Sequence, residues 1–253
     1  MTIIKFLNKL NINTYTIILI FLALLAGLFK EIIIISVIII IHEFGHYYYL
    51  NKYKWNVNKI EIYPFGGITK IDEKLDMPLK EELIITLMGP IFQEILFLFV
   101  IILYKYNLLD KYYYNLFKNY NITILMFNLL PIIPLDGSKI LNIFLNKLFN
   151  FRISYNINIF ISVIFLSIFF IFFKNDSSYY LIIIFLIYQI IFYFKNRYII
   201  FNRFILEKRL NKSNYIKYKK IDNIKGMYRN KRNLIKDDIG YITEYKYINK
   251  SRH

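Results

Sequence analysis

Residues 38–46 of the chain read IIIIHEFGH, and this run is the strongest indication of fold and function in the sequence. On a helix, His42 and His46 lie one turn apart on the same face, so both imidazoles can reach one zinc ion. Glu43 then stands beside the metal, where its carboxylate can take a proton from bound water. A charged group inside an apolar span costs about 2.5–3.5 kcal/mol. The run therefore predicts a functional zinc site, with a polar network between helices as the structural alternative.

The composition indicates a membrane protein. Of the 253 residues, 57% are hydrophobic, and the mean hydropathy is +0.40, whereas soluble domains are about 45–50% apolar. The chain has no cysteine, which excludes disulfides, thiolate zinc sites, iron–sulfur clusters and cysteine nucleophiles. The first apolar run is followed by Lys30 and Glu31 and then by another span, without a small-residue cleavage site. We therefore expect no signal peptide.

Six segments are apolar enough to be membrane spans, each of which needs about 20 mostly apolar residues. If the N-terminus is cytoplasmic, 28 of the 33 Lys and Arg residues lie in cytoplasmic segments, as the positive-inside rule requires. We expect an all-α polytopic membrane protein with six transmembrane helices and both termini in the cytoplasm. The predicted spans are Thr14–Phe29, Glu31–Leu50, Leu83–Tyr104, Tyr120–Pro134, Ile153–Phe173 and Tyr179–Phe194.

The loop over residues 51–80 and the C-terminal segment are the two sizeable regions outside these spans. In the loop, Asn58–Ile62 and Gly67–Ile71 alternate around the run YPFGG at 63–67, which predicts a small membrane-associated β-hairpin. Residues 195–253 hold 17 Lys and Arg against 5 Asp and Glu, and such a basic segment faces anionic lipids. We expect a six-span domain over 1–196 and a short basic cytosolic tail over 197–253. Arg197–Leu210 would be an amphipathic surface helix, followed by either a small strand-containing unit or partly disordered chain.

A catalytic zinc typically has three protein ligands and one open position, so the two histidines need a third partner. Asp136 and Glu94 are the candidate carboxylates. Asp136 is favoured because the fourth span runs in the same direction as the second, which brings its end to the level of the histidines. The neighbouring prolines and Gly137 open the helix and aim the carboxylate. The structural alternative is that Asp136 caps a helix over Gly137–Phe149.

Four motifs combine in one order along the chain: HEFGH at 42–46, PFGG at 64–67, Gly-Pro at 89–90, and Asn128 followed by PLDG at 134–137. The combination resembles the site-2 protease family of intramembrane zinc metalloproteases, most closely the branch of the stage IV sporulation protein FB, over about residues 1–200. The resemblance implies one Zn²⁺ per chain and Glu43 as the catalytic base. It also implies His42, His46 and Asp136 as zinc ligands, and substrate contacts from Asn128, Phe65, Gly66 and Gly67, since an extended substrate can add to a strand edge.

The resemblance further implies a function in regulated intramembrane proteolysis. The enzyme would hydrolyse peptide bonds within or near the transmembrane segment of a single-span or membrane-associated protein, in a bacterial cell membrane, with a membrane-protein regulator as a further partner. Gln93 departs from the family pattern, in which many members have Asn. No PDZ domain interrupts the chain, and the tail is shorter than the paired CBS module of the sporulation branch. The alternative function is a catalytically silent membrane-embedded metal-binding protein or transporter. No nucleic-acid-binding motif accompanies the basic tail, so no nucleic-acid partner is expected.

Overall fold

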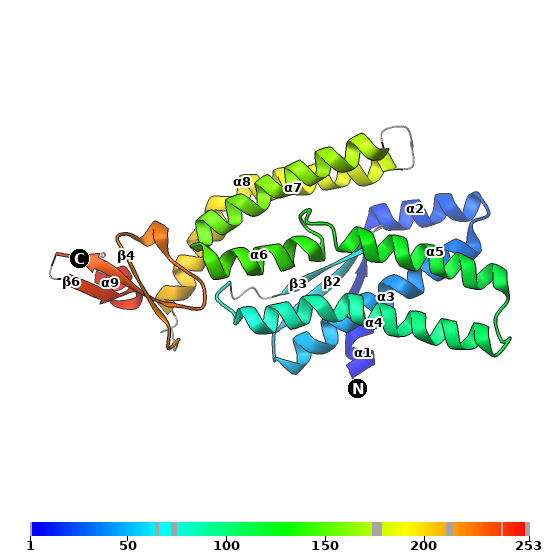
Figure 1. The fold of residues 1–253 in the computed structure, drawn as a ribbon, viewed down its shortest axis with the longest axis horizontal. Coiled ribbons are helices and arrows are strands. Elements are labelled where there is room, and N and C mark those ends of the chain that lie inside the picture. Colours follow the sequence, from blue (N-terminus) through cyan, green and yellow to red (C-terminus); the bar gives the residue numbers. More distant parts are fainter. Residues whose placement is uncertain are drawn as a thin grey trace. The chain divides into compact units, whose positions relative to one another are not determined.

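Apolar helices dominate the computed structural model of the chain, which describes residues 2–63, 66–71, 75–173, 179–210, 215–238 and 240–250 (Figure 1). In this described part, four helices are long and apolar enough to cross a membrane: α3 (Phe29–Lys52), α4 (Leu79–Lys105), α7 (Phe151–Phe173) and α8 (Tyr180–Leu210). Two further helices are shorter, α2 (Thr14–Leu25) and α5 (Lys111–Asn128). The expectation of a mostly helical polytopic membrane protein is confirmed. Two small sheets correct the description as all-α.

The chain divides into two compact units. Unit 1 comprises residues 1–73 and 84–130, and unit 2 comprises residues 74–83 and 131–253. Helix α4 begins in unit 2 and continues without interruption into unit 1. The expected domain boundary after residue 196 falls inside helix α8.

Unit 1 contains the predicted hairpin as part of a three-stranded sheet. Strand β2 (Val57–Tyr63) pairs antiparallel with β3 (Gly66–Ile71), with Ile62 opposite Gly67. On its other side, β2 pairs in parallel with the short strand β1 (Leu10–Ile12), which follows helix α1 (Thr2–Leu7). The hairpin is therefore confirmed, and β1 is an addition that the sequence did not predict.

Helices α3, α4 and α5 form the core of unit 1. Ile38, Val100 and Phe117 are buried together at its centre. The Phe97 ring of α4 lies nearly parallel to the Phe117 ring, with centroids 6.2 Å apart. Stacked aromatic pairs of this kind add about 0.5–1.5 kcal/mol to the free energy gained by burial. The core fixes how α3 and α4 face each other, and both helices carry residues of the site described below.

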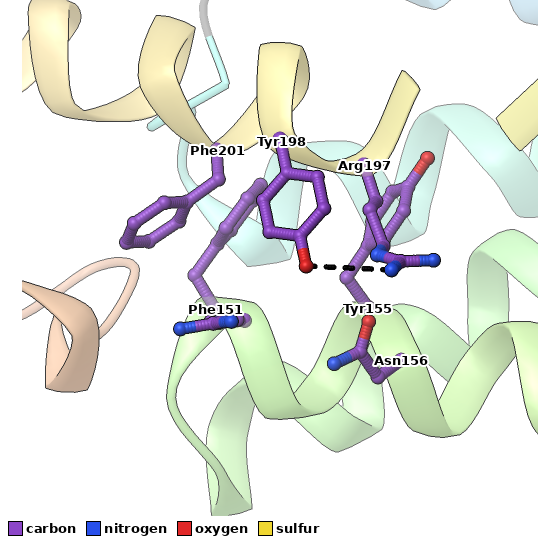
Figure 2. A pocket seen from close by; sticks show the side chains of 7 residues that line it. Phe151, Tyr155, Asn156, Arg197, Tyr198 and Phe201 are labelled. Atoms are coloured by element: carbon purple, nitrogen blue, oxygen red, sulfur yellow. Dashed lines mark hydrogen bonds between the residues drawn. The ribbon is translucent and has the colours of Figure 1, made fainter. Parts of the chain in front are cut away.

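Unit 2 joins the helices α6 (Asp136–Leu148), α7 and α8 to a second small sheet. Helices α7 and α8 pack side by side, and aromatic residues from both line a recess at one end of the pair (Figure 2). The residues of the predicted helix over Arg197–Leu210 are helical, but they continue the last predicted span, because α8 runs unbroken from Tyr180 to Leu210. Arginine and lysine have high helix propensity, so the charges that begin at Lys195 do not end the helix.

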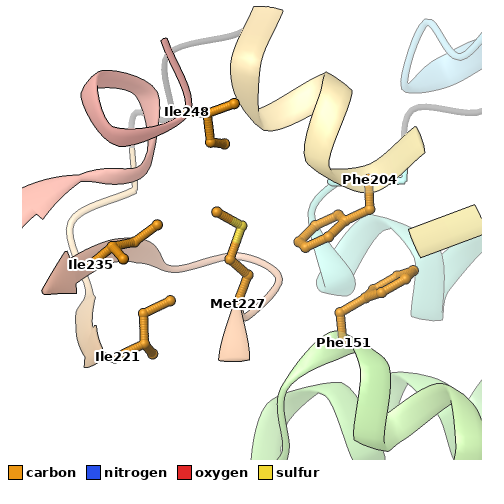
Figure 3. Packing of buried hydrophobic residues seen from close by; sticks show 6 residues of the cluster. All are labelled: Phe151, Phe204, Ile221, Met227, Ile235 and Ile248. Atoms are coloured by element: carbon orange, nitrogen blue, oxygen red, sulfur yellow. The ribbon is translucent and has the colours of Figure 1, made fainter. Parts of the chain in front are cut away.

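The C-terminal tail folds as a strand-containing unit. Strands β4 (Tyr218–Ile221), β5 (Arg232–Asp237) and β6 (Gly240–Thr243) form a sheet in that order, with the 3₁₀ turn η2 (Ile224–Gly226) after β4 and helix α9 (Glu244–Lys250) after β6. Its core continues into the ends of α7 and α8 (Figure 3). The residues that make up this core are Phe151, Phe204, Ile221, Met227, Ile235 and Ile248. The tail therefore packs on the helical part of unit 2 through apolar contacts.

A buried lysine links this tail to the segment that leads into α4. Lys208 of α8 is 1% exposed, and its ammonium nitrogen lies 2.7 Å from Asp76 Oδ2 and 3.7 Å from Glu244 Oε1. It also donates to the Lys231 carbonyl at 3.3 Å. A buried ammonium is tolerated only when it is paired and hydrogen-bonded, and here two carboxylates meet that need.

Residues 75–82 receive further contacts from the tail side of unit 2. The Glu207 carboxylate accepts from the backbone N–H groups of Leu75 and Asp76 at 2.8 and 3.1 Å. Arg229 forms an ion pair with Glu82, in the first turn of α4, at 2.7 Å. The Tyr215 hydroxyl donates to the Asp76 carbonyl at 2.7 Å. Burial, and then the Asp76 charge, raise the pKa of that hydroxyl, so it remains a donor at neutral pH.

The substitution Lys208→Met should lower the free energy of unfolding by about 3–5 kcal/mol, because it leaves the buried Glu244 and the half-buried Asp76 without their counter-charge. The measurement is denaturant unfolding of the detergent-solubilised full chain, compared with the parent. Lys250→Met is the matched control, since it removes the exposed partner of Asp237. The control should leave the unfolding midpoint nearly unchanged. Equal losses in the two variants would contradict a structural role for the Lys208 network.

Candidate metal centre

The two histidines of the HEFGH run lie buried on α3, with His42 3% and His46 5% exposed. Each ring is fixed by an acceptor at its Nδ1 atom. His42 Nδ1 lies 3.0 Å from Gln93 Oε1, and His46 Nδ1 lies 2.8 Å from the Ile85 carbonyl oxygen. Both acceptors belong to α4, so one helix orients both imidazoles of its neighbour.

These contacts determine which ring nitrogens carry protons. A carbonyl oxygen only accepts, so His46 Nδ1 must donate to Ile85. The Gln93 amide nitrogen donates to the backbone oxygen of Asn121 at 2.9 Å and to its side-chain oxygen at 3.1 Å, which leaves Gln93 Oε1 to accept from His42. With both Nδ1 atoms protonated, the Nε2 atoms of the neutral rings carry lone pairs. Those two atoms face each other at 3.1 Å.

Two lone pairs at this distance repel unless a cation lies against both. A tetrahedral zinc ion binds imidazole nitrogens at about 2.0–2.1 Å, which places two such nitrogens about 3.3 Å apart. The donor set and its spacing therefore fit a zinc ion. Ligand histidines that donate their other nitrogen to a carbonyl or amide oxygen are the usual arrangement in zinc proteins.

The backbone of α4 passes close to both Nε2 atoms at Gly89. A Cβ atom at this position would collide with His46 Nε2 and lie 2.8 Å from His42 Nε2. Only glycine leaves this space open. Ile85, Gly89 and Gln93 are spaced four residues apart, so they share one face of α4. On that face, Ile85 supplies an acceptor for His46, Gln93 supplies an acceptor for His42, and Gly89 leaves room for both rings.

The Glu43 carboxylate is held by the hairpin. It is buried, and its Oε1 accepts from the backbone N–H of Gly67 in β3 at 3.1 Å. A Cβ atom at Gly67 would collide with this carboxylate. Gly66 begins β3 opposite Tyr63, whereas Phe65 lies outside the described residues. In the described sheet of unit 1, β3 is an edge strand, so the glutamate lies against an edge that can accept another strand.

Asp136 is the first residue of α6 in unit 2 and is buried. The chain before it is not helical, as its prolines predict. Ser162 of α7 holds this irregular segment, because its hydroxyl accepts from Ile133 N–H at 3.1 Å and lies 3.3 Å from the Pro131 carbonyl oxygen. Lys139, one turn further along α6, forms an ion pair with Asp136 Oδ1 at 2.8 Å. The carboxylate thus stands at the helix N-terminus, which stabilises its charge.

His42, His46 and Asp136 make up the one group of metal-ligating side chains found in the described part of the chain. One ligand atom from each lies within 4.8 Å of the others, and the group could hold one metal ion. Glu94, the alternative third ligand, instead accepts from the Asn121 amide at 2.9 Å. Asn128 is the buried last residue of α5.

Three contributors to the site were not predicted from the sequence. The sequence marked Gln93 only as a departure from the family pattern, although a buried amide in an apolar span indicates a polar partner. Gly89 belongs to the Gly-Pro motif of the resemblance, but its close approach to the two imidazoles was not predicted. Ser162 is one of several serines in apolar helices, and nothing in the sequence distinguishes it from the others.

Comparisons with known proteins agree with this geometry. Residues 30–119 match the family model of peptidase family M50. The chain is therefore similar to peptidase family M50 over residues 30–119, the part that includes the histidine pair and Glu43. It is 33% identical over 152 residues to stage IV sporulation protein FB of Bacillus subtilis, which covers 60% of this chain and 52% of that protein. It is 31% identical over 122 residues to a zinc metalloprotease of Methanocaldococcus jannaschii, covering 47% and 35%.

The structure of a site-2 protease from Methanocaldococcus jannaschii also resembles this chain, with a TM-score of 0.58 and 25% identity. The match covers 72% of this chain and 88% of that one. The chain spans about half the length of the Bacillus relative. The resemblance inferred from the motifs is confirmed, and the M50 match includes the histidines and Glu43.

The substitution Gly89→Ala should abolish zinc binding while the helix is retained, because the methyl group collides with His46 Nε2 and alanine favours helices. The measurement is the zinc content of the purified full chain, expected to fall from about one ion per chain to near zero. Ile95→Ala is the control, since that side chain is exposed on the same helix. A Gly89→Ala protein that retained one zinc ion would contradict the geometry.

The substitution Gln93→Leu should weaken zinc affinity about 10- to 100-fold, because His42 loses the acceptor that fixes its tautomer. Competition with a chelator of known affinity measures the change. Gln93→Glu keeps an acceptor oxygen for His42 and should recover part of the affinity. Gln189→Leu, a buried glutamine of α8, should leave zinc affinity unchanged. An equal loss in both leucine variants would indicate a general packing defect.

Proposed function

We propose that the chain is an intramembrane zinc metalloprotease that hydrolyses peptide bonds within or near the transmembrane segment of membrane-bound proteins. The observation that carries the proposal is the pair of facing Nε2 atoms on His42 and His46, next in sequence to a buried glutamate that is held against a strand edge. Metal binding explains the histidine pair. The adjacent base and the strand edge are what peptide hydrolysis additionally requires.

His42, His46 and Asp136 would hold the ion. When bound, zinc supplies a Lewis acid and lowers the pKa of bound water to about 7. Glu43 is the general base: its carboxylate takes the proton of the attacking water and passes it to the nitrogen of the leaving amine. The N–H of Gly67 orients that carboxylate. Burial of Glu43 limits the access of bulk water, which strengthens these electrostatic interactions.

The substrate must present an extended backbone, because the carbonyl groups of a helix are already hydrogen-bonded. The β3 edge offers unpaired backbone groups to such a segment, with Gly66 and Gly67 at the end nearest Glu43. Phe65 would flank the same edge. Asn128 would contribute its side-chain amide, which makes no hydrogen bond within the described part of the chain. A strand-like substrate would thus lie alongside the base.

We place the enzyme in a bacterial cell membrane with six spans, in which α2 and α5 cross together with the four longer helices. Residues 1–196 would form the protease domain and residues 197–253 the cytosolic tail. The distribution of Lys and Arg along the chain supports a cytoplasmic location of both termini. The substrates would be single-span or membrane-associated proteins, with a membrane-protein regulator as a further partner.

The substitution Glu43→Gln should lower the rate of cleavage about 10²- to 10⁴-fold and leave the zinc content unchanged, because it removes the base and not a ligand. The assay is cleavage of a single-span model substrate reconstituted in vesicles with the full chain. Glu31→Gln, in the first turn of the same helix, is the control and should cut at the parent rate. A Glu43→Gln protein as fast as the parent would disprove the role of this base.

The substitution Asp136→Ala separates the role of a ligand from that of a base. It should reduce both zinc occupancy and cleavage, because two imidazoles alone bind zinc weakly. Zinc content and cleavage are measured on the same preparation. Full zinc occupancy in this variant would exclude Asp136 as a ligand. Zinc flux into vesicles carrying the parent protein, with no cleavage of any substrate, would favour a transporter instead.

A further inference from the structure

The recess between α7 and α8 in unit 2 shares no residue with the candidate metal centre. It is a shallow recess that opens to the surface. Its walls come from the first turns of α7 and from the part of α8 that follows the apolar run over residues 180–194. The lining residues are Phe151, Arg152, Tyr155, Asn156, Arg197, Tyr198 and Phe201 (Figure 2). Two arginines therefore line one small aromatic recess.

Both guanidinium groups lie against the same aromatic ring. The Cζ atoms of Arg197 and Arg152 lie 4.7 and 5.9 Å from the centroid of the Tyr198 ring. Arg197 also stacks on Phe194 at 3.9 Å and donates to the Tyr198 hydroxyl at 3.3 Å. In the described residues neither arginine forms an ion pair with a carboxylate. Two half-buried cations gathered on one ring repel each other, and an anion between them would relieve that repulsion.

We propose that this recess binds the phosphate headgroup of an anionic phospholipid. Guanidinium groups bind phosphate oxygens with two parallel hydrogen bonds, which is the strongest form of this contact. The Asn156 amide, exposed in the recess wall, adds two further donors. Nothing in the proposed proteolysis uses these residues.

The position of the recess favours a lipid over a soluble anion. Arg152 is the second residue of α7, and Arg197 follows the apolar run of α8, so both lie where a membrane span ends. Arginine and tyrosine side chains at such positions lie at the depth of the headgroups. Exposed apolar side chains continue along the same two helices, among them Phe160, Ile164, Ile187, Ile191 and Phe194. They offer a surface for acyl chains that a soluble phosphate would not use.

The experiment measures lipid binding to the purified full chain in neutral detergent, by native mass spectrometry over a titration with phosphatidylglycerol or phosphatidylcholine. The parent should bind phosphatidylglycerol about tenfold more tightly, as expected for charge-assisted hydrogen bonds. The double variant Arg152→Gln, Arg197→Gln should lose this preference. The matched control Lys195→Gln, Arg203→Gln removes the same charge from exposed positions of α8 and should keep it. Zinc content, measured in parallel, reports on folding and is independent of the recess.

Each of the following results would overturn the proposal. The first is a parent without preference for the anionic lipid, and the second is an equal loss in the control variant, which would indicate diffuse attraction to the basic surface. The third is displacement of phosphatidylglycerol by millimolar inorganic phosphate, which would indicate a site for soluble anions. The double variant Arg152→Lys, Arg197→Lys keeps both charges, so it serves as a control for misfolding of the glutamine variant. It should bind more weakly than the parent, because an ammonium group cannot form the paired contact, and unchanged affinity would also count against the proposal.

Discussion

The site depends on two hydrogen bonds, in which the Nδ1–H groups of His42 and His46 donate to acceptors on the neighbouring helix α4. Once those protons are directed away, the two Nε2 lone pairs must face each other. The spacing of Ile85, Gly89 and Gln93 makes this possible, because residues four apart share a helix face. Any larger residue at the central position would occupy the space between the rings. One face of α4 therefore determines which nitrogen atoms of the two α3 histidines are available to bind a metal ion.

The helix that carries those acceptors is stabilised at its beginning by the C-terminal tail. Arg229 pairs with Glu82 in the first turn of α4, and Lys208 pairs with Asp76 just before it. In each pair the cation is buried, so the pair is costly to break. Ile85 lies only one turn after Glu82 on the same continuous helix. The tail is thus integral to unit 2 rather than an appendage, and its basic composition gave no indication of this role.

Much of the fold and of the site followed from strong local patterns. The HEFGH run predicted the buried histidine pair, and the alternation around YPFGG predicted the hairpin. Strand β1 was missed because three residues show no period, and it forms only by pairing with β2. The continuation of α8 past Lys195 was missed because charged residues appeared to end the span, although they have high helix propensity. Gly89 acts through a tertiary contact, which no local pattern contains.

A polar network between helices was the structural alternative to a metal site, and the structure contains such a network. Glu94, Asn121 and Gln93 satisfy one another by hydrogen bonds at 2.9–3.1 Å. The network ends at His42 Nδ1, so it accounts for the outer nitrogen of that ring and not for the facing Nε2 atoms. Hydrogen bonding alone would require a proton shared between the two Nε2 atoms, and so a buried imidazolium. A metal ion held by the two Nε2 atoms and the Asp136 carboxylate accounts for the same spacing without that proton. The network therefore supports the metal centre rather than replacing it.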